Sequence, residues 1–320
     1  MDTDFASDPL LPPEIERMIF EIAFDIQSPQ DNWKLVSVAK RVRTWLRPLI
    51  YSTFIQFVNA KAFPNMKTYP GFIDLKEICQ FALNHLVDLS NLTTHDAVSD
   101  LLEKCPNLTN LACWGHIDAH HLWPSLSKLS KLRRLSAKVE HISSTQFLSA
   151  TFSSRLTHLE MLEPTNDWKF ESLISLTSLT HLAIFYPSFT LDYKRLGTIL
   201  QACHGIHVFV LTTQHGDLGE AGKDLYVADC RMVVLDDSLS EMKHWIYDVN
   251  GHNDSWEYAE QVVLMRRVRW IQLDILCHRN ITAFQYVKTI LGTPWDDYLT
   301  EEGMKWIQNS ILSELGPLSD

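Results

Sequence analysis

Three histidines and an aspartate lie within six positions of one another and could in principle hold a metal ion: His116, Asp118, His120 and His121. Residues four apart on a helix share one face, so His116 and His120 could bind the same ion. The sequence lacks a His-Glu-x-x-His motif, and the segment offers no obvious third ligand or general base. We therefore expect surface histidines here and no metal site, and we rank a metal-dependent hydrolase last among the possible functions.

Other signatures of chemistry are also weak. Residues 215–222 contain spaced glycines, but not in the order of a nucleotide-binding loop, and no Walker lysine-serine pair follows them. The chain contains no Gly-x-Ser-x-Gly motif that would present a nucleophile, and no Cys/His signature. Its six cysteines form no Cys-x-x-Cys pair, which is typical of buried thiols in a reducing compartment. The sequence predicts a protein without catalytic residues or cofactor.

The net charge and the apolar content of the chain argue against several classes of binding partner. The 320 residues carry 28 basic and 39 acidic side chains, a net charge of −11, which argues against bulk binding of nucleic acid or anionic lipid. With 46% apolar residues the chain can bury a core, yet no apolar run reaches the roughly 20 residues that span a bilayer. The acidic leader, residues 1–8, is unlike a secretion signal. We expect a soluble protein of the cytoplasm, the nucleus or both.

The chain begins with a pattern of short amphipathic helices. Pro12 and Pro13 suit the first turn of a helix, and apolar residues then recur at helical spacing as Ile15, Met18, Ile19 and Ile22. A second helical pattern follows from Trp33, and Pro48 is expected to end or kink that helix just before Leu49. So many large apolar side chains on about fifty residues indicate a partner surface.

Residues 9–54 resemble an F-box, the helical motif that docks on the Skp adaptor of cullin-RING ubiquitin ligases. The similarity is carried by Leu11-Pro-Pro-Glu-Ile15, Ile19-Phe20, residues 33–38 and Trp45-Leu-Arg-Pro-Leu-Ile-Tyr51. It implies that the adaptor contacts Leu11, Pro12, Ile15, Ile19, Val36, Leu46, Pro48 and Leu49. The alternative is that several of these residues form the internal core of a small helical cap.

A second pattern, L-x-x-L-x-L, recurs every 23 to 27 residues, starting at Leu83, Leu108, Leu132, Leu156, Leu179, Ile206 and Cys230. These spacings match leucine-rich repeats, in which each turn adds one strand to a parallel sheet. The asparagine typical of the turn is mostly missing, so an irregular solenoid is expected. The predicted α/β fold has a leader (1–8), F-box-like module (9–54), connector (55–78), solenoid (79–239) and helical carboxy-terminal cap (240–320).

Alternation in each strand assigns residues to two faces. The fourth and sixth positions of the repeat should point inward, which leaves the third, fifth and seventh on the concave surface. The candidate target-binding residues on that surface are Trp114, Arg134, Lys138, His158, Glu160, His181 and Phe185. Lys128, Lys131, Arg133, Arg134 and Lys138 form a basic stretch, of which Arg134 and Lys138 share the concave face; with His158 and His181 they could form a positive stripe that holds carboxylate or phosphate groups. The alternative is a solvated basic loop.

The carboxy-terminal region holds five of the ten tryptophans and three helical patterns, at about residues 254–267, 281–291 and 300–315. A solenoid must cover the open end of its last repeat, and these helices could do so. The third position of the repeat turns apolar at Val208 and Met232, so we expect both to be covered by this region.

The F-box resemblance implies a substrate-receptor subunit of an SCF-type ligase, with the Skp adaptor, and through it cullin, bound to the amino-terminal helices. A target protein would then bind the repeats. A non-catalytic scaffold that binds partners without promoting ubiquitination remains an alternative.

Overall fold

The computed structural model describes residues 11–24, 32–56, 75–88, 95–114, 119–139, 141–162, 164, 168–186, 192–213, 219–236, 245 and 255–267. Its centre is an eight-stranded sheet whose strands follow one another in chain order, each pair of neighbours being parallel. The strands are β1 (Thr53–Gln56), β2 (Asn84–Asp88), β3 (Asn110–Trp114), β4 (Arg134–Lys138), β5 (His158–Leu162), β6 (His181–Tyr186), β7 (Val208–Thr213) and β8 (Met232–Asp236). This arrangement confirms the predicted α/β class and parallel sheet.

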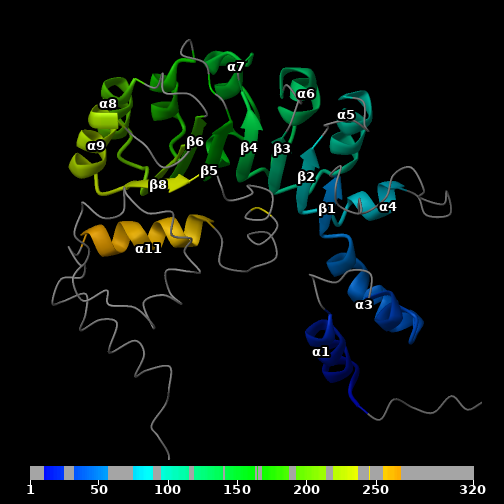
Figure 1. The fold of residues 1–320 in the computed structure, drawn as a ribbon. Helices are drawn as coiled ribbons and strands as arrows, with labels where there is room; N and C mark the ends of the chain where they lie inside the picture. Colours follow the sequence, from blue (N-terminus) through cyan, green and yellow to red (C-terminus); the bar gives the residue numbers. More distant parts are fainter. Residues whose placement is uncertain are drawn as a thin grey trace, which may run out of the picture.

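Helical return segments connect the strands on one side of the sheet, as Figure 1 shows. They are α4 (Leu75–Cys79), α5 (His95–Lys104), α6 (Ala119–Leu126), α7 (Ser144–Leu148), the 3-10 turns η1 (Ser153–Arg155) and η2 (Phe170–Ser175), α8 (Tyr193–Ala202) and α9 (Gly219–Ala228). A further helix, α11 (Ser255–Arg267), lies on the opposite side, against the concave face of β7 and β8 (Figure 1). The sheet is therefore covered on both faces over its last strands.

The main core lies between the sheet and the return helices. In the middle strands the fourth and sixth repeat positions point into it, as predicted, with pairs such as Leu135 and Ala137 fully buried. The first repeat position is also buried in every middle turn, at Leu108, Leu132, Leu156, Leu179 and Ile206. Each turn thus buries its apolar face on its neighbours, and one continuous core runs from Val36 to Met232.

The predicted register of the first repeat is wrong by one residue. His85, not Leu86, pairs with Leu111, so Leu86 points to the concave face while Leu83 is exposed. A slip of one position moves every side chain of a strand to the other face, and this segment has leucines on both. Its core residues are Ala82 and His85.

The last repeat is also shifted by one residue. Met232 pairs with Phe209 and belongs to the main core, whereas Val233 lies on the concave face. The residues from Met232 to Leu235 are all apolar, so alternation cannot fix their orientation. The expected cover is confirmed for Val208, which packs under α11; Met232 is buried, but on the opposite face.

Three short helices precede the sheet: α1 (Pro13–Ala23), α2 (Asn32–Val36) and α3 (Lys40–Ile50). Val42, Leu46 and Ile50 of α3 are buried in the main core. The Arg41 guanidinium donates two hydrogen bonds to the Glu16 carboxylate, at 2.8 and 2.7 Å, and so ties α3 to α1. Arg47 similarly donates to Glu77 of α4 at 2.8 Å. These contacts join the amino-terminal helices to each other and to the first return segment.

Two expectations for this region need correction. Pro48 does not end α3, which continues to Ile50; the proline sits in the last turn, where Tyr51 N still donates to Arg47 O. The sheet also begins one strand earlier than predicted, because β1 spans the predicted boundary between module and connector and pairs with β2.

The expected helix near residues 254–267 is confirmed as α11. The acidic leader and the helices expected at 281–291 and 300–315 lie outside the described residues. Within the described ranges no helix is long and apolar enough to cross a membrane.

His85 generates a prediction about pH. Its ring is fully buried beside Phe54, at 6.0 Å between centroids, and neither ring nitrogen has a hydrogen-bond partner. Burial lowers the pKa of His85 to about 3, so the folded chain disfavours the protonated form. Since the unfolded chain takes up that proton near pH 6.5, stability falls as the pH drops from 6.5 towards 3.

His85→Leu should remove this loss while preserving the fold. Between pH 7 and pH 5, the fall in free energy of unfolding should be smaller than in the wild type by about 2 kcal/mol. Urea titrations at both pH values measure it, and His204→Leu, which replaces an exposed histidine, serves as the control. An unchanged pH dependence in His85→Leu would show that this ring is not kept neutral by burial.

Candidate functional site

The first candidate surface is the apolar face of α1. None of the α1 residues is buried, although the helix is strongly amphipathic in sequence. Ile15, Met18 and Ile19 are 40–49% exposed and Ile22 is 78% exposed; Leu11, just before the helix, is 43% exposed. Large apolar side chains gathered on one helix face in this way mark a surface for a partner.

The eight predicted adaptor-contacting residues divide into two groups. Leu11, Pro12, Ile15, Ile19 and Pro48 are exposed, and Leu49 is half-buried. Val36 and Leu46 are buried in the main core at 2% and 0% exposure, so they support the module rather than face a partner. Met18, Ile22 and Val38 are exposed as well but were not among the predicted contacts. Met18 and Ile22 recur at helical spacing with Ile15 and Ile19, and this spacing could have placed them on the same apolar face.

The second candidate surface is the concave face of the sheet. Its third repeat positions form one column across neighbouring strands: Asn84, Asn110, Arg134, His158 and His181. The Asn84 amide donates to the Thr53 hydroxyl at 3.0 Å, and the Asn110 amide donates to the Asn84 side-chain oxygen at 2.6 Å. Polar side chains therefore pair from strand to strand along this column.

The two histidines of the column are stacked and packed under α11. Their ring centroids lie 4.1 Å apart with an interplanar angle of 5°, and the Trp256 ring meets both edge-on. The hydroxyls of Thr157 and Thr180 lie 2.9 and 2.8 Å from Nδ1 of His158 and His181, respectively. Nε2 of His181 lies 2.9 Å from Glu260 Oε1. These contacts fix both rings and connect them to α11.

Burial keeps this histidine pair neutral. It lowers the pKa of His158 to about 2; repulsion between protonated His158 and a protonated His181, and the positive charge of Arg134, act in the same direction. Burial also lowers the pKa of His181; Glu260 opposes this effect, whereas Arg134 and His207 reinforce it. A neutral imidazole can accept a hydrogen bond at Nδ1 and donate at Nε2, which suits the partners of His181.

The carboxy-terminal half of α11 is joined firmly to the sheet. Ala259, Val262 and Val263 are buried against Ala183, Val208, Val210 and Val233 of β6, β7 and β8. This second apolar cluster differs from the expected role of the helix, because α11 covers the concave face of the last strands and not the open end of the last repeat. His158 and His181, predicted to be available to a target, are therefore covered by the chain itself.

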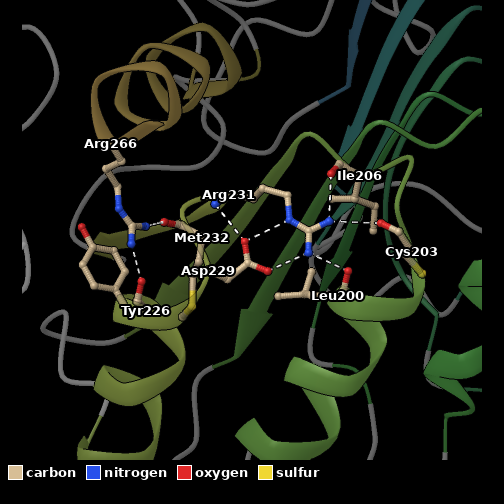
Figure 2. A network of polar contacts seen from close by, with 8 residues as sticks. All are labelled: Leu200, Cys203, Ile206, Tyr226, Asp229, Arg231, Met232 and Arg266. Atoms are coloured by element: carbon tan, nitrogen blue, oxygen red, sulfur yellow. Dashed lines mark hydrogen bonds and ion pairs between the residues drawn. The ribbon is translucent and has the colours of Figure 1, made fainter. Parts of the chain in front are cut away.

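Two arginines, Arg231 and Arg266, donate hydrogen bonds to backbone carbonyl groups in and around the last repeat, as Figure 2 shows. The Arg266 guanidinium, 5% exposed, donates to the carbonyl oxygens of Met232 and Tyr226 and lies 3.9 Å above the Tyr226 ring centroid. Arg231 donates to the carbonyl oxygens of Leu200, Cys203 and Ile206 at 2.6–3.2 Å, at the end of α8 (Figure 2). Arg266 thereby fixes α11, and Arg231 satisfies carbonyl groups that α8 leaves unpaired.

Asp229 lies between these cations in the network. Arg231 donates to its two carboxylate oxygens at 2.9 and 2.6 Å. Burial alone would raise the pKa of Asp229, but the hydrogen bonds from the Arg231 side chain and backbone, with the charge of Arg266, lower it. The carboxylate therefore stays ionised and balances the buried positive charge.

A third apolar cluster lies on the concave face near the other end of the sheet. Trp245 packs there against Leu86, Ala112, Trp114 and Leu162, with Ile55 and Phe185 at its margin. The Trp114 indole Nε1 donates to the Ser136 hydroxyl at 2.6 Å. Trp114 is 6% exposed and Trp245 9%, so the predicted target-binding Trp114 and Phe185 already contact a side chain of the same protein.

The remaining predicted target-binding residues, Arg134, Lys138 and Glu160, are half-buried on the concave face. Desolvation raises the pKa of Glu160, and a hydrogen bond with the Ser136 hydroxyl opposes this rise in part. Outside this face, Lys128 pairs with Glu103 at 3.0 Å and Lys131 donates to Asn107 at 2.6 Å. Arg134 and Lys138 share the concave face, as predicted, but His158 and His181 do not extend a positive stripe from them, because burial lowers the pKa of both rings.

The predicted histidine cluster lies on the helical side of the sheet. His120 and His121 are exposed at the start of α6, and the His121 ring stacks on that of His95 with centroids 4.7 Å apart. His116 and Asp118 are not among the described residues. In the part of the chain that the structure describes, no three His, Cys, Asp or Glu side chains could hold a metal ion together.

The structure thus has two candidate surfaces for a protein partner: an exposed apolar helix face and a concave sheet face carrying polar and aromatic side chains. Sequence reasoning placed both but missed Trp245, Trp256 and Glu260, which occupy the concave face; the abundance of tryptophan after residue 240 was the available signal. No model of a known protein family matches the chain, and no similar curated protein was found.

The role of Arg266 can be tested by Arg266→Ala. The change leaves two carbonyl groups without their donor and removes the contact with Tyr226. We expect the free energy of unfolding in urea to fall by about 2–4 kcal/mol. The control Arg155→Ala removes an exposed arginine and should change it by less than about 0.5 kcal/mol. Equal stability of the two variants would contradict the anchoring role.

Proposed function

We propose that the chain is a substrate-receptor subunit of an SCF-type cullin-RING ubiquitin ligase. In this proposal the exposed face of α1 docks on the Skp adaptor, and the repeats, interpreted as irregular leucine-rich repeats, hold a target protein on their concave side. The protein itself would be non-catalytic and would act in the cytoplasm or nucleus. Residues 9–54 carry the F-box resemblance on which the choice of adaptor rests.

The observation that carries the proposal is the exposed apolar face of α1. An eleven-residue helix is marginal in water by itself, and most helical stability in proteins comes from packing of the apolar face. Here that face is turned outward, and since most of its large side chains are about half exposed, each would contribute roughly 1 kcal/mol if a partner buried the remainder. An adaptor that covers this face would supply the missing packing.

The arrangement of the two surfaces supports a receptor role. The helices α2 and α3 share one continuous core with the sheet, and α1 is joined to them by the Arg41–Glu16 pair and by Phe20, which packs against that core, so a partner bound to α1 and a target bound to the repeats would be held on one body. Such a protein promotes a reaction by raising the effective concentration of the target near an enzyme carried by the rest of the complex. No group of its own has to act as acid, base or nucleophile.

The adaptor site can be tested by Ile15→Glu combined with Ile19→Glu in the full chain. Two carboxylates on the apolar face would have to be desolvated in the complex, so binding to the Skp adaptor should weaken at least a hundredfold. The control Ile174→Glu changes an equally exposed isoleucine of η2, 49% exposed, and should bind like the wild type. Co-purification and calorimetric titration with the adaptor measure the difference.

Two results would reject this function. One is adaptor binding by the double variant as tight as that of the wild type; the other is no adaptor binding by the wild type at all. If the adaptor binds but a captured target is never ubiquitinated in a reconstituted reaction, the scaffold interpretation holds instead.

A further inference from the structure

Two cysteines occupy equivalent positions in the first two return segments. Cys79 is the last residue of α4 and Cys105 directly follows α5; each comes five positions before the first residue of the next strand, Asn84 or Asn110. Both are fully buried, and both are reduced. The thiol of Cys105 forms a hydrogen bond with the thiol of Cys79. Two sulfur atoms of neighbouring turns are therefore in contact in the core.

Hydrogen bonds between the two turns hold the backbone around this pair. Asn107 Nδ2 donates to the carbonyl oxygen of Gln80 at 2.6 Å, and Thr109 N donates to that of Leu83 at 2.8 Å. Neighbouring strands of a sheet lie about 4.8 Å apart, and a disulfide requires Cα atoms roughly 4.4–6.8 Å apart. Equivalent residues just before two neighbouring strands therefore lie at a separation that a disulfide can bridge.

Packing alone does not require two thiols at this place. In later turns the equivalent position holds Leu129 and Leu176, which are buried in the same core. Cys203 also occupies this position, but the equivalent residue of the preceding turn is Leu176. The position thus accepts leucine or cysteine, and the first two turns bring two cysteines together.

We propose that Cys79 and Cys105 form a reversible disulfide that joins the first return segment to the second. The oxidant is a low-molecular-weight disulfide such as oxidised glutathione. One cysteine thiolate attacks a glutathione sulfur, the glutathione S–S bond breaks, and one glutathione thiolate leaves. The second cysteine attacks the sulfur of the first, forms the protein S–S bond and releases the second glutathione thiolate. The two cysteines lose two electrons and two protons, which two molecules of reduced glutathione carry away.

Burial controls when this exchange takes place. The hydrogen bond with Cys79 and burial both raise the pKa of the Cys105 thiol, so the closed structure holds little of the reactive thiolate. Exchange therefore requires local opening of α4, a helix of only five residues. Closure then favours the protein disulfide at equilibrium, because the two sulfur atoms are already held together and lose little further freedom when they bond.

The disulfide acts where the amino-terminal helices join the repeats. Arg47 of α3 donates to Glu77 of α4, and Ile78, beside Cys79, lies in the main core. A covalent bond from α4 to the second repeat therefore strengthens the connection between α3 and the sheet. The inference goes beyond the proposed function and does not rest on it, since neither the Skp adaptor nor a target takes part.

The experiment equilibrates the native full-length protein, without oxygen, in buffers with increasing ratios of oxidised to reduced glutathione. After an acid quench, remaining thiols are alkylated in denaturant and disulfides are identified by mass spectrometry of tryptic fragments. Cleavage after Lys76, Lys104 and Lys128 places Cys79 and Cys105 on separate fragments, residues 77–104 and 105–128. We expect at least tenfold more of the disulfide between these fragments than of any other protein disulfide, because only this pair is held in contact.

Two variants assign the disulfide to one pair of sulfur atoms. Cys113→Ala, the matched control, removes the other buried cysteine of residues 105–128 and should form the disulfide like the wild type. Cys105→Ala should not form it. The urea midpoint of unfolding should be higher for oxidised than for reduced Cys113→Ala, because the disulfide closes a loop between the first two repeats. Oxidation should not raise the midpoint of Cys105→Ala.

Three results overturn the proposal. The first is that Cys79 and Cys105 remain thiols in the native protein at the most oxidising ratio. The second is that Cys79 pairs as often with Cys113 or Cys203 as with Cys105. The third is that the disulfide forms only after unfolding in urea, because the native contact then plays no part. If Cys105→Ala does not fold, the fragments of the wild type and of Cys113→Ala still decide between these results.

Discussion

The in-register stacking of parallel strands is the constraint on which the rest of the structure depends. Once Leu111, Leu135, Leu159, Leu182 and Phe209 align as one inward column, strand alternation fixes every residue of the opposite face. Equivalent residues of successive repeats then lie one strand apart, so like side chains meet. The Asn84–Asn110 hydrogen bond and the stacked rings of His158 and His181 are direct consequences. The concave face is therefore a set of columns, and the residue type at each position of the repeat determines which side chains a column contains.

The two ends of the stack are stabilised by different kinds of contact. At the amino-terminal end, α3 and β1 extend the main core through apolar residues such as Leu46 and Phe54. At the other end, Arg231 and Arg266 provide donors for carbonyl groups of the last return segments and strand. The buried positive charge of this second end is acceptable because Asp229 and several carbonyl oxygens surround it.

The sequence was most informative where one face of a strand was apolar and the other polar. In β4 and β5 the inward residues are apolar while Arg134, Ser136, His158 and Glu160 mark the other face, so the predicted orientation was right. In the first and last repeats both faces carry apolar residues, and the register was set instead by pairing with the neighbouring strand. β1 was missed because its four residues are too few to display a period. Local spacing also could not show that α11 and Trp245 return to the concave face, since that depends on contacts between residues far apart in the sequence, such as His181 with Glu260, 79 positions apart.

The residues of the concave face change from polar to apolar along the sheet, and this change explains where α11 and Trp245 lie. Over β7 and β8 the residues of the concave face are apolar, with Val208, Val210 and Val233, and α11 buries them. Over β2 to β5 the third positions remain polar, and those of β2 and β3, Asn84 and Asn110, hydrogen-bond to each other, whereas Trp245 covers an apolar patch at other positions of this face. The two covers differ in the apolar surface that they bury. The helix α11 buries several side chains of β6, β7 and β8, whereas Trp245 buries one patch with a single indole ring. The carboxy-terminal region therefore contributes in two ways: α11 covers the last strands through many contacts, whereas Trp245 covers one apolar patch near the middle of the sheet.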